Sequence, residues 1–250
     1  MKTTKVLETQ ISNTNISEVA DILTSNIGVT VAICNTNTVV RCRKNIYLQK
    51  VINGFDIKTP DGFPIAKSLS IFNKKKQARV DGYKVFLETI EQGLSKKTSH
   101  YFFGSNNTTT DLMIKKLQTI YPEIIILGKK CPEFMTHHEL AIKYHKHLSQ
   151  IDADIIWVSL GFPKQELFID EINQISRLHQ NLVGVGAVFE WVAETKVKAP
   201  EWLANLGIEW VFRLVQEPRR LFKRYLIDNT LFVYYFLNQI FRKSQESEKE

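Results

Sequence analysis

This chain of 250 residues is 44% apolar and 24% charged, a composition that excludes wholesale disorder and can supply a sizeable buried core. Its formal net charge of +7 is compatible with nucleic acid, an anionic membrane surface or a phosphorylated substrate. The cysteines, Cys34, Cys42 and Cys131, show no metal or redox spacing, so we expect reduced thiols in a cytoplasmic protein. We expect no secretory signal after Met1, and the apolar stretch at 231–241 is too short to span a bilayer.

The first predicted element is a buried strand at 29–33, VTVAI, followed by a polar run from Asn35 to Thr38. Residues 43–54 have a helical pattern, which Gly54 is expected to end. The segment 59–62, TPDG, is predicted to be a turn from its Pro, Asp and Gly content.

From residue 100 onward, predicted strands and helices alternate. The strands are expected at 101–103, 124–127, 155–160 and 182–185, and Gly128 is expected to end the second of them. The helices are expected up to Tyr121, at 136–148, and from about Gln165. This alternation predicts an α/β fold with a Rossmann-like, mainly parallel sheet flanked by helices. Ligands of such sheets bind at the carboxyl ends of the strands.

The composition changes after Pro200, where aromatic and basic residues occur together in a helical pattern. We therefore predict an α/β core at 1–200, a helical C-terminal appendage at 201–243 and a polar tail at 244–250. The apolar side chains of 231–241 fit packing on the core, on a second subunit or on a membrane surface equally well.

Two charged residues in the first half of the chain are candidates for catalysis. Asp61 lies between Pro60 and Gly62, so a rigid turn would hold its carboxylate where a general base is needed. An aspartate that only stabilises its own turn is the simpler interpretation of the position alone. Arg79, in the segment RVDG, offers paired donors that fit a diphosphate and neutralise leaving-group charge, although an ordinary surface arginine is the simpler interpretation of the residue alone.

Three loops after predicted strands are candidates for ligand binding. The run from Gly104 to Thr108 fits either a phosphate or sugar site at a helix start or an ordinary capped loop. In 161–166, GFPKQE, Gln165 suits a hydrogen bond to uracil or a sugar, or simply begins a helix. The glycines of 184–189, GVGAVF, match a dinucleotide fingerprint incompletely. The histidines show no ligand spacing, so we predict no metal site.

The motifs occur in an order that resembles one family. They are TPDG at 59–62, RVDG at 79–82, FFGS at 102–105, YPEI at 121–124, SLGFPKQE at 159–166, VGVGAVFEW at 183–191, KAPEW at 198–202 and GIEWVFRLVQEPRRLFKRY at 207–225. Together they resemble the WecG/TagA/CpsF glycosyltransferases, also called glycosyltransferase family 26.

The resemblance implies a membrane-associated α/β hexosyltransferase on the cytoplasmic face of the inner membrane. Such enzymes move N-acetylmannosamine or a related sugar, with inversion and without a divalent metal or other cofactor, from a UDP-sugar to an undecaprenyl-diphosphate-linked sugar. Their products belong to cell-envelope polysaccharides such as capsule and exopolysaccharide.

The resemblance also implies roles for individual residues. Asp61 matches the catalytic base and Arg79 an active-site arginine, while Gln165 lies near the nucleotide-sugar. The basic residues implied to contact diphosphate and membrane are Arg213, Arg219, Arg220 and Arg224.

This sequence departs from the family pattern at positions expected near the donor. Asn35 stands where the family often has threonine, with Asn37 retained, and both remain candidates for substrate binding with Gly104. Ala187 and Glu190 replace glycine and aspartate, so the donor sugar is left open between N-acetylmannosamine, its uronic acid and a related hexose.

The sequence also leaves other functions open. One alternative is a UDP-sugar transferase with a soluble acceptor. A second is a basic nucleic-acid-binding protein, although no helix-turn-helix, zinc or RNA-binding signature is present, so we expect no nucleic acid as partner. A third, a scaffold without activity, is disfavoured by the presence of Asp61, Arg79 and Gln165. The oligomeric state stays open, and a homo-oligomer is compatible with the sequence.

Overall fold

The computed structural model describes residues 1–247, apart from the side chains of residues 205, 220, 223–225, 243, 244, 246 and 247. The first part of the chain contains β1 Thr3–Val6, β2 Thr9–Ser12, α1 Ile16–Ser25, β3 Thr30–Cys34, α2 Thr36–Lys44, α3 Ile46–Gly54, β4 Ile57–Pro60, α4 Phe63–Asn73 and α5 Gly82–Lys96. The second part contains β5 Ser99–Gly104, α6 Asn107–Ile120, β6 Ile125–Lys130, α7 His137–Ser149, β7 Ile155–Ser159, α8 Lys164–Ile175, β8 Asn181–Gly184, α9 Val188–Val192, α10 Glu201–Asn205, α11 Glu209–Gln216 and α12 Pro218–Ser247.

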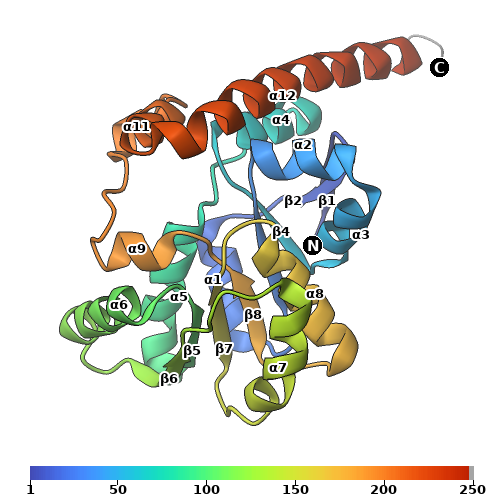
Figure 1. The fold of residues 1–250 in the computed structure, drawn as a ribbon. Helices are drawn as coiled ribbons and strands as arrows, with labels where there is room; N and C mark the ends of the chain where they lie inside the picture. Colours follow the sequence, from blue (N-terminus) through green and yellow to red (C-terminus); the bar gives the residue numbers. More distant parts are fainter. Residues whose placement is uncertain (248–250) are drawn as a thin grey trace.

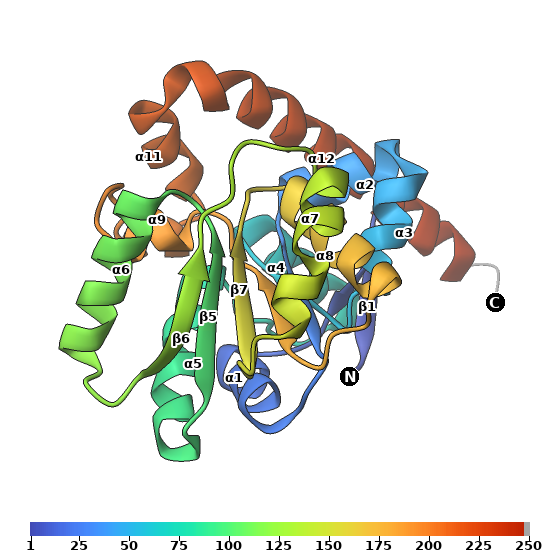
Figure 2. The ribbon, with the colours of Figure 1, turned by 60° about the horizontal axis from the view of Figure 1, so that its bottom comes forward.

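The main sheet confirms the predicted α/β class. Within the described residues it has six strands in the order β4-β3-β8-β7-β5-β6, and every neighbouring pair is parallel. Figure 2 shows β7, β5 and β6 side by side. The strands' carboxyl ends therefore meet along one edge, which is where such sheets bind ligands. The amino-terminal β1–β2 hairpin is antiparallel and separate from this sheet, and no pattern in the sequence had predicted it.

Side chains alternate between the two faces of the sheet because successive residues of a strand point in opposite directions. On β7, Ile156 and Val158 join a core with α2, α3, α7 and α8, while Ile155 and Trp157 join a core with α1, α5, α6 and α9. Trp157 is fully buried, and its ring centroid lies 4.7 Å from that of Phe86. Full burial of each large apolar side chain contributes about 1.5–3 kcal/mol, so both faces need a covering layer of helices.

Two predicted boundaries were wrong for local reasons. The helix expected at 43–54 is two helices, and the first begins at Thr36 because Asn35 caps it: the Asn35 side chain accepts a hydrogen bond from the backbone of Thr38. The polar run is therefore a helix start. Gly128 does not end its strand, since β6 continues to Lys130 through a register shift opposite His100 and Tyr101. A glycine can mark a bulge as well as a stop.

The appendage consists of α10, α11 and α12, which lie over the carboxyl edge of the sheet (Figure 1). Helix α12 passes across α2 and α4 and continues to Ser247, into the segment from residue 244 that we predicted to be a polar tail. Its middle packs on the core through Phe232, which is buried, and through Phe236, which meets Phe72 of α4. Gln239 then donates to the Lys5 carbonyl and accepts from the Leu7 backbone, so α12 is tied to the β1–β2 turn.

No helix in the described part of the chain combines the length and apolar character that crossing a bilayer requires.

Candidate active site

Asp61 follows directly after β4, at the carboxyl edge of the sheet. Its backbone N–H donates to the Cys34 carbonyl of β3 at 2.9 Å, which fixes its position between the two strands. The next residue, Gly62, has φ = 80° and caps α4, a conformation that glycine adopts without strain. The carboxyl group is largely covered, and this desolvation raises the pKa of Asp61 to about 7 against the opposing charge of Arg79.

Arg79 lies beside Asp61 because the adjacent Val80 donates a backbone hydrogen bond to the Pro60 carbonyl at 3.0 Å. The Arg79 Nε lies 3.9 Å from Asp61 Oδ1, and Nη2 lies 3.0 Å from Asp81 Oδ2. The Nη1 group donates to Glu209 of α11. The predicted catalytic pair is thus brought together, inside a cluster of carboxylates that holds the guanidinium in place.

Two pockets meet at this cluster. The larger, which we call the edge pocket, has a volume of about 530 Å³ and follows the carboxyl edge of the sheet. The smaller, the appendage pocket, has about 270 Å³ and lies between α4, α10, α11 and α12. Five residues line both pockets: Asn35, Asp61, Arg79, Glu209 and Arg213. A group bound in one pocket therefore faces a group bound in the other across the Asp61 carboxylate and the Arg79 guanidinium.

Gln165 lines the edge pocket, but its amide is used to join the loops that form the floor. Its oxygen accepts from the backbone of Gly161 at 3.2 Å and of Gly186 at 3.0 Å, and its nitrogen donates to Glu166. The side chain is 3% exposed and so holds the ends of β7 and β8 together.

Gly104 lines neither pocket. A Cβ at this position would approach the Ser159 carbonyl oxygen to 2.2 Å, so its role in the structure is the close approach of β5 to β7. The next residue, Ser105, faces the edge pocket instead.

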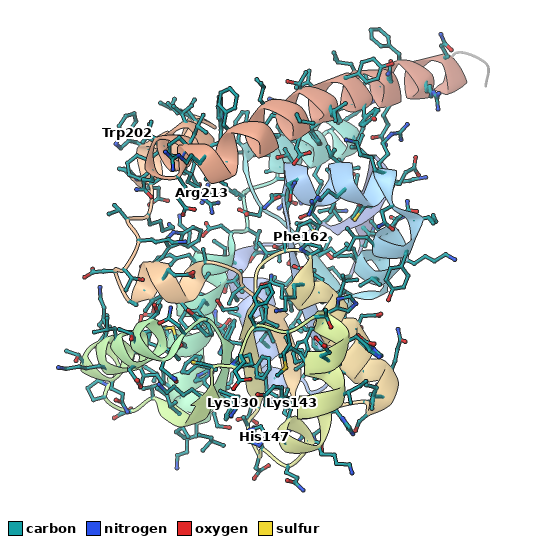
Figure 3. The ribbon with its side chains drawn as sticks, in the orientation of Figure 1. Lys130, Lys143, His147, Phe162, Trp202 and Arg213 are labelled. Carbon is teal, nitrogen blue, oxygen red and sulfur yellow. The ribbon has the colours of Figure 1, made fainter. Side chains whose placement is uncertain are left out.

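Basic residues from the segment between α9 and α10 and from α11 line the edge pocket. Lys196 and Lys198 line it, and Lys196 lies 3.9 Å from Glu190, another predicted binding residue that lines this pocket. Arg213 enters from α11 with its guanidinium 5.3 Å from the ring centre of Trp191, and Figure 3 shows it between the appendage and the sheet. These cations suit a ligand that carries phosphate groups.

The remaining predicted binding residues are two asparagines near the start of α2 and arginines of the appendage. Asn35 caps α2 and lines both pockets. Asn37 lines the appendage pocket and donates to Asp228 of α12, so it joins the core to the appendage. Arg219 is exposed and lines neither pocket. The side chains of Arg220 and Arg224 lie outside the described residues.

Two members of the cluster, Asp81 and Glu209, were not predicted from the sequence. Asp81 lies in the segment RVDG and Glu209 in the segment GIEW, but the sequence does not show that both carboxylates contact the Arg79 guanidinium. Asp81 caps α5 by accepting from the Lys84 backbone, a pattern that could have identified it as a fixed carboxylate. Glu209 lies 130 residues after Arg79, and nothing local indicates the contact.

Histidine, cysteine and acidic side chains do not gather in a metal-binding group of three or more within the described residues. Independence of a divalent metal stays a prediction.

A parallel sheet with a polar, partly cationic pocket along its carboxyl edge places this chain among the α/β proteins whose ligands bind where the strands end. The chain belongs to the WecG/TagA/CpsF family of glycosyl transferases, whose family model matches residues 4–246.

Two relatives carry the same descriptive name, N-acetylglucosaminyldiphosphoundecaprenol N-acetyl-beta-D-mannosaminyltransferase. The protein of Bacillus subtilis strain 168 is 25% identical over 213 residues, which cover 83% of this chain and 81% of that protein. The protein of Bacillus spizizenii strain W23 is 25% identical over 198 residues, which cover 79% of this chain and 75% of that protein.

Proposed function

We propose that this protein transfers a hexose-type sugar from a UDP-sugar to a sugar linked to undecaprenyl diphosphate, in the synthesis of a cell-envelope polysaccharide. The observation that carries the proposal is the meeting of two pockets at Asp61 and Arg79. In this arrangement the edge pocket holds the donor and the appendage pocket admits the acceptor. The names of the two bacillary relatives support a lipid-linked acceptor.

In the proposed reaction, Asp61 acts as the general base. Its carboxylate accepts the proton of the acceptor hydroxyl as that oxygen forms a bond to the anomeric carbon of the donor. The bond from this carbon to the diphosphate breaks on the opposite side, and its electron pair leaves with UDP, so the configuration inverts. A pKa of about 7 suits this role because a base is most effective when its pKa lies near the working pH.

The departing UDP gains negative charge, and the basic residues of the edge pocket are placed to stabilise it. Arg79 and Arg213 line both pockets and Lys196 lines the edge pocket, so fixed positive groups surround the region between donor and acceptor. Fixed charges of this kind stabilise a transition state without reorganisation of solvent. In this scheme no divalent metal or other cofactor takes part.

The appendage pocket has the character expected for the lipid-linked acceptor. Phe63, Pro64, Trp210, Phe232 and Val233 contribute apolar surface to it, next to the polar Asn35 and Asn229. The outer faces of the appendage carry further exposed apolar side chains: Trp202, Leu206, Val211, Val215, Phe222, Leu226, Tyr234, Leu237 and Phe241. Such a surface suits binding to the membrane interface, so we propose a peripheral position on the cytoplasmic face of the inner membrane.

The donor sugar is proposed as N-acetylmannosamine, its uronic acid or a related hexose. The relatives' names favour N-acetylmannosamine. The region around Glu190 and Lys196, where this chain differs from the family pattern, is the part of the edge pocket most suited to altering this choice.

The experiment that tests the proposal is a measurement of UDP release by the purified protein. A panel of UDP-sugars is assayed with and without a polyprenyl-diphosphate-linked sugar. We expect release with one of them to depend on the lipid-linked acceptor. Release that depends only on a soluble sugar would favour the soluble-acceptor alternative, and no affinity for uridine nucleotides would overturn the proposal.

A further inference from the structure

Glu209 is the one residue of the appendage whose carboxylate, among the described side chains, is hydrogen-bonded to the Arg79 guanidinium. It is the first residue of α11, and it lines both pockets. Arg213, one turn later, lines both pockets too. The same helix face therefore brings a carboxylate and a guanidinium to the junction between donor and acceptor.

Two other contacts between core and appendage do not involve Arg79. Glu201 of α10 pairs with Lys84 of α5, but the two side chains are 61% and 39% exposed and neither lines a pocket. Gly207 packs against the Phe63 ring, where a Cβ would come within 3.0 Å. These contacts hold α10 and α11 on the core, whereas Glu209 also orients a residue of the reaction.

We propose that Glu209 is a positioning residue that makes the placement of Arg79 depend on the docking of α11. The inference rests on the proposed function, in which Arg79 stabilises the departing diphosphate. The transfer site is then complete only when the appendage lies over the sheet edge, and the appendage contributes to the reaction through a carboxylate as well as through its basic residues.

The geometry leaves Arg79 able to bind phosphate while Glu209 holds it. A guanidinium has five N–H donors. Glu209 takes one on Nη1, and Asp81 lies 3.0 Å from Nη2, while the distance from Nε to Asp61 is 3.9 Å. Each terminal nitrogen carries a second N–H, so the two carboxylates fix the plane of the group without using all of its donors.

Glu209 also affects the pKa of Asp61, the proposed general base. The charged groups that face Asp61 are Arg79, Asp81 at the start of α5, and Glu209 and Arg213 of α11. The negative charge of Glu209 disfavours ionisation of Asp61, and so adds to the rise in its pKa that burial produces. Removal of that charge lowers the pKa of Asp61, so the carboxylate form persists to lower pH.

The test compares E209Q, E209D and E201Q with the unaltered enzyme, with UDP release followed as a function of pH. Glutamine keeps the shape of residue 209 and removes its charge. We expect E209Q to lower kcat by roughly 10–100-fold, similar to the loss when a hydrogen-bonding partner that orients a metal ligand is removed. The acid limb of its pH profile should move to lower pH. E209D should recover part of the rate, and E201Q, which breaks the exposed ion pair with Lys84, should match the unaltered enzyme.

Hydrogen exchange of the α11 amides provides a readout that does not need turnover. We expect exchange to be faster in E209Q than in E201Q, because only the first loses the charge of the ion pair with Arg79 and so weakens that contact. Equal kcat and equal acid limbs in E209Q and E201Q would overturn the inference while leaving the proposed function intact. If the unaltered protein releases no UDP from any UDP-sugar, the proposed function fails, and equal α11 exchange in the two variants would then overturn the role of Glu209 separately.

Discussion

Asp61 is held at the end of β4 among covered side chains, and its neighbours are themselves charged. Burial raises its pKa, Arg79 opposes that rise, and Asp81 and Glu209 reinforce it. A carboxylate desolvated in this way is a better base and a poorer contributor to stability than an exposed one. Activity and stability are therefore expected to respond in opposite directions to substitutions at this position.

Replacement of Asp61 by asparagine should lower kcat about 10²–10⁴-fold, because the amide cannot accept the acceptor proton. UDP binding, measured by calorimetry, should change much less. The matched control is Asp21→Asn, which alters an exposed aspartate that pairs with Lys96 on the surface. Near-normal turnover in Asp61→Asn would show that another group is the base.

Stability should depend on pH through the same residue. The folded-state pKa of Asp61 is about 7 and the ordinary value is 3.8, so the folded protein binds this proton more tightly than the unfolded chain does. The contribution is fully present below pH 3.8 and is lost as the pH rises through about 7. We expect Asp61→Asn to melt at a higher temperature than the unaltered protein at pH 8, by about 2–4 °C per kcal/mol. The difference should shrink toward pH 4, and a constant difference would contradict it.

At the scale of elements, the junction between α10 and α11 controls how the appendage lies on α4. Gly207 has φ = 76°, and its Cα faces the Phe63 ring so closely that a Cβ would lie 3.0 Å from it. Both the backbone conformation and the contact select glycine. The appendage pocket depends on this approach, since Phe63 and Gly207 both line it.

We therefore expect Gly207→Ala to destabilise the protein by about 1–3 kcal/mol through strain in the backbone and displacement of Phe63. Thermal melting measures the loss, and the KM for the lipid-linked acceptor should rise more than the KM for the donor. Gly54→Ala at the end of α3 is the control, because a Cβ added there would meet no atom of another segment within 4 Å. Equal effects of the two substitutions would show that the Phe63 contact is unimportant.

In the molecule as a whole, one broad side of α12 is left apolar and exposed. Its side chains are Phe222, Leu226, Ile227, Tyr234, Leu237 and Phe241, while Phe232 and Phe236 on another side pack on the core. A helix with one face packed on the protein and a second, apolar face exposed is suited to lie in a membrane interface.

We expect the double substitution Leu237→Ser and Phe241→Ser to reduce binding to vesicles of anionic lipid at least several-fold, because each lost apolar contact costs about 1 kcal/mol or more. Flotation measures the binding, and activity on a water-soluble acceptor analogue should be retained. Ile120→Ser with Leu127→Ser is the control, since these exposed apolar residues lie on α6 and β6, far in sequence from the appendage. Unchanged flotation of the α12 variant would show that this exposed face does not bind the membrane.

Local sequence patterns were enough to predict the alternation of strands and helices, the parallel sheet and the polar loops that follow its strands. These depend on local patterns, such as the apolar runs of β5 and β7 and the glycine and proline residues between elements. Local pattern alone did not single out Asp61 and Arg79; the resemblance of their segments to the family did. Errors at Asn35 and Gly128 arose because a cap and a bulge use the same residue types as a loop and a stop.

The folded chain was needed to show which side chains share the candidate site and which support the scaffold. The Gln165 amide oxygen accepts hydrogen bonds from the backbone of two loops, and Gly104 allows β5 to approach β7 closely. The Asn37 side chain donates to Asp228 of α12. Glu209 joins the cluster from the far end of the chain. The physical reason is that hydrogen bonds and charge interactions act over a few ångströms in space, whatever the separation in sequence, whereas a sequence pattern records only neighbours along the chain.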